Sequence, residues 1–142
     1  HEIYRARRYQ APLSVMLFEI DVAVEPGASK QLIKRISQRI VAETRQSDLV
    51  TQMADTTFLF LQPMTTEKNS VEVANRMRDN FIKNPIILNE TPISLNVSVG
   101  ISSFRALDAD ASEMLLRADR AVFKAKKHHN DSIIAYTRHK DV

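Results

Sequence analysis

The sequence predicts an α+β domain in which a mainly antiparallel sheet is covered by helices. Short apolar stretches with the spacing of strands alternate with longer stretches whose apolar residues recur at helical spacing. The chain has 142 residues, of which 44% are hydrophobic, and this is enough for one domain with a buried core. Because the chain begins with His1, we expect residues 1–142 to be a single domain from a longer, multidomain protein.

The composition excludes several classes of protein. There is no cysteine, which rules out disulfide frameworks and thiolate metal sites. The net charge of +3 fits an anionic ligand but is too small to indicate a nucleic-acid polymer. No apolar run approaches the roughly 18 residues of a membrane span, and no secretory signal is present. We therefore expect no membrane insertion and a cytoplasmic location, which includes the cytoplasmic part of a membrane-associated protein.

The first half of the chain predicts a helix end, a strand, a helix and a hairpin. Residues 2–12 have the pattern of the end of an entering helix, and residues 13–21 form a short, mostly apolar strand. A helix is expected from Ser29 to about Thr44. Two apolar runs, 48–53 and 58–62, flank a small polar turn and predict a hairpin.

The second half predicts a helix, a long strand, a helix and a short strand. The first helix covers about 66–83, residues 93–104 alternate as a strand, a helix follows Asp110, and 132–136 close the chain. The side chains expected on the buried faces are Leu32, Ile33, Ile36, Ile40, Val71, Ala74, Met77, Phe81, Ile93, Leu95, Val97, Val99, Ile101, Leu115, Ala118, Val122 and Ala125. The order β-α-β-β-α-β predicts a ferredoxin-like core, to which a helix and a strand are added.

Four stretches together resemble the GGDEF domain of bacterial diguanylate cyclases. They read RARRYQAPLSVMLFEID at 5–21, RQSDLV at 45–50, SLNVSVGIS at 94–102 and LLRADRAVFKAK at 115–126. The similarity covers nearly the whole chain, and the four stretches occur in the family's order. The resemblance implies the cyclase-palm version of the predicted core.

The family's hairpin signature, Gly-Gly-Asp/Glu-Glu-Phe, is largely lost. Counted onto this chain, it falls on Ala54, Asp55, Thr56, Thr57 and Phe58, and Phe58 is expected in the core. In the family the glycines let the backbone approach the nucleotide, while the acidic side chains hold metal and help activate the attacking 3′-hydroxyl of GTP. Thr56 and Thr57 offer only neutral hydroxyls, whereas magnesium prefers anionic oxygens and phosphoryl transfer depends on the metal. We therefore expect a degenerate domain that is not an enzyme, with no catalytic residue, no metal and no cofactor.

Other positions of the family's active site also differ. The Asp-Ile-Asp motif is Glu19-Ile20-Asp21, whose two acids share one strand face and could still bind a metal. The loop that recognises guanine is about six residues shorter by our alignment, and Lys30 takes the place of one of its recognition residues. The family's Gly-Arg-Asn is replaced at 129–131, while Lys126 remains where a triphosphate-contacting lysine is expected.

A second site of the family is preserved. Many diguanylate cyclases bind their product, cyclic di-GMP, at an inhibitory Arg-x-x-Asp motif five residues before the signature. Here Arg45 and Asp48 keep that spacing, and Arg76 matches an arginine that the family adds from the next helix. We expect Arg45 to bind phosphate or guanine, Asp48 to accept guanine N–H groups, and Arg76 to pair with phosphate or stack on a base.

Simpler interpretations of the charged residues stay open. Arg45 and Asp48 could form only a local ion pair. Solvated helix faces account for the nearby arginines and for several lysines, and placement at a helix C-terminus accounts for the histidine pair better than metal binding does. The residues concerned are Arg35, Arg39, Arg78, Lys124, Lys127, His128 and His129, while Arg117 and Asp119 are expected to be structural.

These observations lead to one functional hypothesis and two alternatives. The first is an inactive GGDEF domain that binds cyclic di-GMP and regulates a neighbouring domain or a signalling or secretion partner, with exopolysaccharide and biofilm control suggested by the resemblance. The second is a ligand-free scaffold that forms homodimers. The third is a GTP-sensing domain that regulates a phosphodiesterase and depends on Glu19, Asp21 and Lys126.

Overall fold

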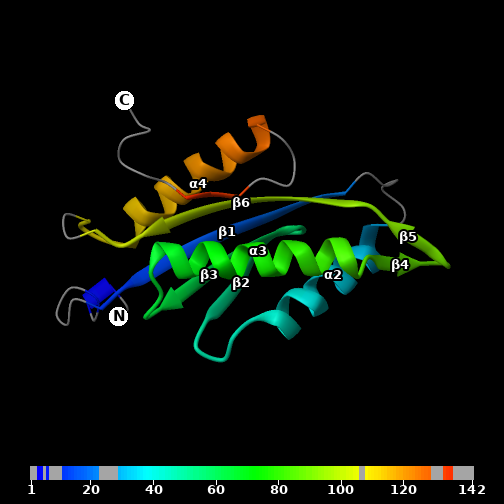
Figure 1. Cartoon of the computed structure of the whole chain (residues 1–142), viewed down its shortest axis with the longest axis horizontal. Coiled ribbons are helices and arrows are strands. Elements are labelled where there is room, and N and C mark those ends of the chain that lie inside the picture. The colour runs from blue at the N-terminus through cyan, green and yellow to red at the C-terminus, as the bar shows by residue number, and fades with distance from the viewer. Residues whose placement is uncertain are drawn as a thin grey trace.

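The main sheet has five strands in the order β2-β3-β1-β6-β7 (Figure 1). The computed structural model describes residues 3–4, 6, 11–22, 29–105, 108–128 and 133–135. The strands are β1 (Leu13–Val22), β2 (Leu49–Ala54), β3 (Thr57–Pro63), β6 (Leu95–Ser103) and β7 (Ile133–Ala135). Only β6 and β7 run parallel, and the other neighbouring strands are antiparallel. The predicted α+β class and the mainly antiparallel sheet are confirmed.

Helices cover both faces of this sheet (Figure 1). Helices α2 (Ser29–Glu43) and α3 (Glu67–Lys83) lie on one face, and α4 (Ala111–His128) lies on the other. Helix α3 begins after Thr66, whose hydroxyl accepts a hydrogen bond from the Asn69 amide, so this start is capped. The predicted helices agree with the structure to within one or two residues at each described end.

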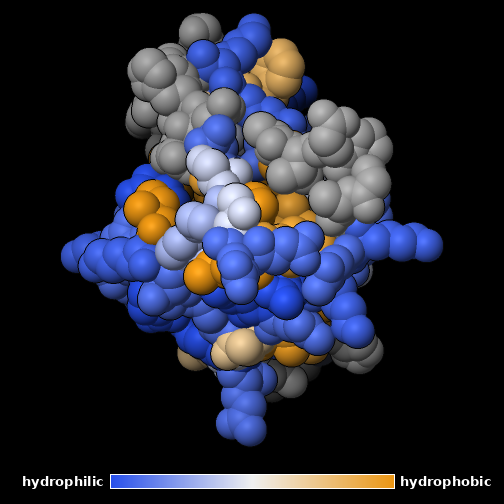
Figure 2. Space-filling model, turned by 90° about the vertical axis from the view of Figure 1, so that its right-hand side faces the viewer, coloured by the Kyte–Doolittle hydropathy of each residue, from blue (hydrophilic) through white to orange (hydrophobic). Residues whose placement is uncertain are grey.

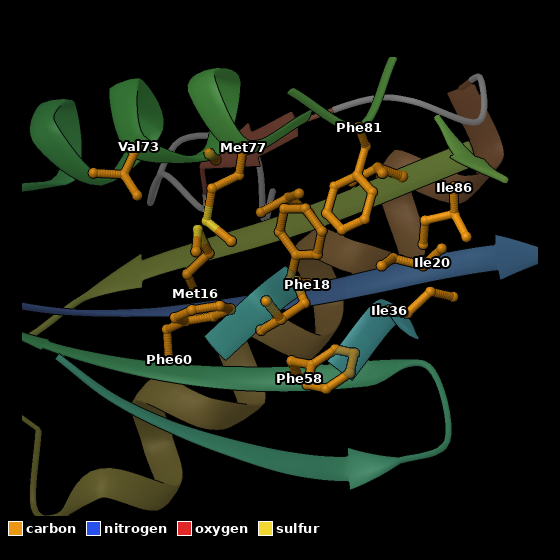
Figure 3. Close-up of a cluster of buried hydrophobic side chains, with 14 of the residues drawn as sticks. Met16, Phe18, Ile20, Ile36, Phe58, Phe60, Val73, Met77, Phe81 and Ile86 are labelled. Carbon is orange, nitrogen blue, oxygen red and sulfur yellow. The ribbon is translucent and has the colours of Figure 1, made fainter. Parts of the chain in front are cut away.

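The larger core lies between the sheet and helices α2 and α3 (Figure 3). Phe18 is its centre, with its ring edge-on to Phe60 at a centroid distance of 6.3 Å and tilted against Phe81 at 6.1 Å. Aromatic pairs at these distances add favourable contacts beyond the area that they bury. Odd-numbered residues of β1, such as Val15 and Leu17, point to the α4 side, as the period of two requires.

Helix α4 packs unusually close to β6 because residue 100 is a glycine. A Cβ atom at Gly100 would lie 2.2 Å from the Ala118 carbonyl oxygen and 2.6 Å from the Val122 nitrogen. On the face of α4 that packs on the sheet, Met114 is fully buried, whereas Leu115 is 36% exposed. The prediction that Leu115 belongs to the core was therefore wrong by one residue of helix rotation.

A short hairpin of β4 (Ile86–Leu88) and β5 (Thr91–Ile93) forms a separate two-stranded sheet that the sequence did not predict. Its turn residues, Asn89 and Glu90, have φ values of 50° and 66°. The hairpin forms one end of the molecule, where hydrophobic patches are scattered over a hydrophilic surface (Figure 2).

Two expectations remain, namely the helix at the start of the chain and the absence of a membrane span. The entering helix predicted at 2–12 lies mostly outside them, although Ile3, Tyr4 and Ala6 are helical. None of the described helices is long and apolar enough to cross a membrane.

Candidate functional site

The hairpin between β2 and β3 carries the degenerate signature. Asp55 and Thr56 form its turn, and Ala54 pairs with Thr57. The side-chain amide of Gln52 donates a hydrogen bond to the Asp55 carbonyl at 3.0 Å and supports the turn. The described residues with positive φ are elsewhere, so this turn closes without the left-handed conformation that favours glycine. Phe58 is 2% exposed, which agrees with its expected place in the core.

The two acids of β1 lie beside this hairpin and under α4. Glu19 is opposite Thr57 in the register, and the Ile20 amide donates to the Thr56 carbonyl at 2.9 Å. Lys126 of α4 donates to Glu19 and forms an ion pair with it. This hydrogen bond raises the pKa of Lys126; partial burial opposes the rise, and the charges of Glu19 and Asp21 support it.

These residues do not fit a magnesium site. The Glu19 carboxylate is already neutralised by Lys126, and the facing residue, Thr57, is neutral. Within the described ranges, no three histidine, cysteine, aspartate or glutamate side chains gather closely enough to hold a metal. Asp21 and Asp55 do line one groove of about 330 Å³ together with Thr56. Lys30 is exposed in the first turn of α2 and does not line this groove, and residues 129–131 lie outside the described residues.

The structure brings Arg45 and Asp48 together in a two-pronged ion pair. Arg45 Nε donates to one Asp48 oxygen at 2.9 Å, and Nη2 donates to the other at 3.0 Å. Nη2 also donates to the Thr65 hydroxyl at 3.0 Å, and that hydroxyl donates to the Pro63 carbonyl. The Asp48 side chain is 2% exposed, whereas that of Arg45 is 35% exposed. Arg45 is thus fixed in place with Nη1 outside these bonds, while Asp48 is occupied.

Arg76 lies in a neighbouring groove between α2 and α3. The groove has a volume of about 510 Å³ and is lined by Glu43, Arg76, Asp79, Asn80, Lys83 and Asn84. Arg76 is exposed, and no hydrogen bond from it is found within the described residues. Glu43, which lines the groove, lies at the end of α2 and two residues before Arg45 in the sequence. No contact joins Arg76 directly to that pair in the described part of the chain.

Two nearby arginines have structural contacts that the sequence did not reveal. Arg35 donates to the Ile87 carbonyl, and Arg39 donates to the Asn84 carbonyl and lies 5.3 Å from the centre of the Phe81 ring. Arg35 thus ties α2 to β4, and Arg39 ties α2 to the segment between α3 and β4. The interpretation of Arg35 and Arg39 as simply solvated is therefore incomplete.

Glu43 is the residue of this region that sequence reasoning missed. Its Oε2 atom is shielded from solvent and has no hydrogen-bond partner in the described structure. Burial raises the pKa of Glu43, although the charges of Arg39 and Arg76 act to lower it. The only signal in the sequence was its position four residues after Arg39, a spacing that places two side chains on one helix face.

A second buried ion pair lies away from the grooves and is structural. Arg117 donates to both Asp108 oxygens at 2.7 Å and also bonds Ser102 and the Ser103 carbonyl. Burial would raise the pKa of Asp108, but the hydrogen bonds from Arg117 and the Arg105 amide outweigh it, so that the pKa is lowered. The pair anchors the start of α4 to the end of β6, as expected of a structural Arg117.

Comparison with known proteins identifies the family of this chain. Residues 27–132 match the family model described as "Diguanylate cyclase, GGDEF domain", and the chain belongs to this family. Diguanylate cyclase DosC of Escherichia coli K12 is 24% identical over 139 residues, which are 93% of this chain and 30% of DosC. The chain thus spans less than a third of the length of this relative.

Solved structures show the same fold. The active GGEEF domain of a diguanylate cyclase from Vibrio cholerae superimposes with a TM-score of 0.83 at 20% identity, covering 96% of this chain and 90% of that chain. The GGDEF domain of DgcB from Caulobacter crescentus, solved in complex with c-di-GMP, superimposes with a TM-score of 0.84 at 12% identity. That match covers 95% of this chain and 84% of the DgcB chain. The cyclase-palm fold predicted from the sequence is confirmed.

Proposed function

We propose that this GGDEF domain is a receptor for cyclic di-GMP that has no cyclase activity. The observation that supports this proposal most directly is that two arginines lie on the α2–α3 side of the sheet. Arg45 is held rigidly by Asp48 with part of its guanidinium still available, and Arg76 is exposed in the adjacent groove. A fixed guanidinium binds phosphate or the guanine edge with little further loss of side-chain freedom.

The size and the polar lining of the groove suit a nucleotide. Its volume of about 510 Å³ falls within the range of small-molecule sites. Arg76 and Lys83 supply positive charge for the two phosphates, and Asn80 and Asn84 offer both hydrogen-bond donors and acceptors. In this proposal, Asp48 orients Arg45 rather than reading the base, because its side chain is almost fully buried. The DgcB structure supports the proposal at the level of the family's ligand only.

The β2–β3 hairpin and the adjacent part of β1 support the proposed lack of turnover. Phosphoryl transfer between nucleotides requires metal ions that neutralise the developing charge. Here the hairpin offers Thr56 and Thr57 in place of carboxylates, and Glu19 is paired with Lys126. The same pairing weighs against a GTP sensor, because the cation expected to bind the triphosphate is already engaged.

The proposed role is regulatory. Ligand bound between α2 and α3 would contact whatever packs on this side, either another domain of the same protein or a separate signalling partner. Control of exopolysaccharide export and biofilm formation is the process that we suggest, by analogy with the family.

Calorimetric titration with cyclic di-GMP tests the proposal. We expect the wild type to bind, and Arg76→Ala and Arg45→Ala each to lose about tenfold or more in affinity, since each removes charge-assisted hydrogen bonds. Arg76 is exposed, so its variant should fold normally, whereas Arg45→Ala leaves buried Asp48 unpaired and needs a melting curve beside the titration. Arg120→Ala on the exposed face of α4 is the matched control and should bind like the wild type.

Two outcomes would overturn the proposal. An absence of binding by the wild type would remove the receptor role, and wild-type affinity after both arginine substitutions would remove the assignment of the ligand to this groove. Formation of cyclic di-GMP from GTP and magnesium, followed by chromatography, would remove the claim of inactivity. Affinity for GTP that requires Lys126 would favour the sensor alternative instead.

A further inference from the structure

An unsatisfied carboxylate lies at the edge of the Arg76 groove. Oε2 of Glu43 is shielded from solvent and makes no hydrogen bond within the described residues, although the Glu43 side chain lines the groove. Buried polar atoms are almost always hydrogen-bonded, because an unmade bond costs free energy. Because the Glu43 side chain lines the groove, a rotation of its carboxylate toward the groove would offer this acceptor to a ligand.

The neighbouring cations do not satisfy Glu43. Arg39 donates to the Asn84 carbonyl and stacks over Phe81, and no hydrogen bond from Arg39 to Glu43 is found within the described residues. Arg76 affects Glu43 through its charge, but no hydrogen bond between them is found. These charges do not outweigh burial, and the pKa of Glu43 remains raised. Oε2 of Glu43 therefore remains without a hydrogen-bond donor in the described part of the chain.

Guanine is the base that supplies the missing donors. Its N1–H and N2–H₂ groups lie side by side and match the two oxygens of a carboxylate, whereas adenine presents a bare N1 acceptor at the same edge. Asp48 was the acceptor expected from the sequence, but both of its oxygens accept from Arg45. Among the described acids near the two arginines, Glu43 combines an unmade hydrogen bond with a place in the groove.

We propose that Glu43 is the residue that reads guanine in the groove, with Arg76 beside it binding phosphate or stacking on the base. This inference rests on the proposed receptor function and adds its base specificity. It places a specificity determinant at the C-terminal end of α2, outside the Arg-x-x-Asp motif. In this proposal Asp48 holds Arg45 in place, and Glu43 selects the base.

The test compares Glu43→Gln with the wild type in titrations with cyclic di-GMP and cyclic di-AMP. Glutamine keeps the shape of the side chain, removes its charge and directs an NH₂ group toward the guanine donors. We expect the wild type to prefer cyclic di-GMP by at least about tenfold, and Glu43→Gln to lose about tenfold to a hundredfold for cyclic di-GMP. Its affinity for cyclic di-AMP should change little, so the preference for guanine should shrink.

Asp119→Asn is the matched control, because Asp119 is exposed on α4 and lines none of the described grooves. It should keep the wild-type preference. Unchanged or tighter binding of cyclic di-GMP by Glu43→Gln would overturn the inference, since Glu43 would then only restrain Arg76. If Arg76→Ala loses affinity while Glu43→Gln does not, the receptor function stands and this inference fails. If the wild type binds neither dinucleotide, both fail.

Discussion

Substitution of Gly100 by alanine should show how strongly the fold depends on close packing between α4 and β6. The added Cβ would lie 2.2 Å from the Ala118 carbonyl oxygen and 2.6 Å from the Val122 amide nitrogen, and both obstructing atoms belong to the backbone. No change of rotamer relieves such contacts, so the helix must retreat by on the order of 1 Å to regain ordinary separations.

That retreat sets the size of the effect. Overpacking of a core typically costs about 1–3 kcal/mol, and we expect the upper end because Ala118, Ala121 and Val122 would also lose contact with the sheet. A loss of about 3 kcal/mol corresponds to a fall of roughly 10 °C in Tm for a domain of this size. Urea unfolding and thermal melting, both followed by circular dichroism, measure the two quantities.

Two further variants make this measurement decisive. Ser98→Ala lies on the same face of β6 and removes a buried hydroxyl without a found partner, so it should change stability by less than about 1 kcal/mol. Val122→Ala relieves the side-chain contact at 2.8 Å but not the backbone contacts, and should not rescue Gly100→Ala. A melting temperature within about 2 °C of wild type, or rescue by Val122→Ala, would refute the reasoning.

Two more predictions concern stability. Asp108→Asn should cost about 3 kcal/mol at pH 7, because it leaves the buried Arg117 guanidinium without its counter-charge. Since folding lowers the pKa of Asp108, its stabilisation is present above the unfolded value of 3.8 and is lost as pH falls through the folded value. The free energies of unfolding of the variant and the wild type, measured in urea across pH, should therefore converge in acid. A difference that stays constant with pH would contradict the lowered pKa of Asp108. Glu90→Gly should raise the free energy of unfolding by about 0.5–1 kcal/mol, because glycine adopts a φ of 66° without strain, and an unchanged urea midpoint would contradict this.

The main elements of the fold could be predicted because their patterns are long. The apolar faces of α2 and α3 repeat over four turns, and β6 alternates over nine residues. The β4–β5 hairpin was not predicted because strands of three residues are too short to show an alternating pattern. In addition, Glu90 occupies a turn position where a glycine would have indicated a hairpin. Leu115 was misplaced because Met114, one residue away, fits the same apolar stripe.

The proximity of Arg45 and Asp48 could be predicted from the sequence, but the state of their side chains could not. Spacing brought Arg45 and Asp48 to one place, yet it gave no indication that the carboxylate would be buried and fully used by the arginine. The importance of Glu43 depends on what surrounds it across α3, and contacts between distant segments leave no local pattern. The same reason hid the carbonyl contacts of Arg35 and Arg39.

The ion pair between Glu19 and Lys126 has a consequence for any attempt at reversion. Rebuilding an acidic signature at Thr56 and Thr57 would add negative charge next to Glu19, which could then reach a metal only by abandoning its lysine partner. The substitutions should therefore show strong epistasis, with each change ineffective until position 19 is altered as well. Under the proposed lack of turnover, single substitutions at Thr56 or Thr57 would therefore not be enough to give synthesis of the dinucleotide.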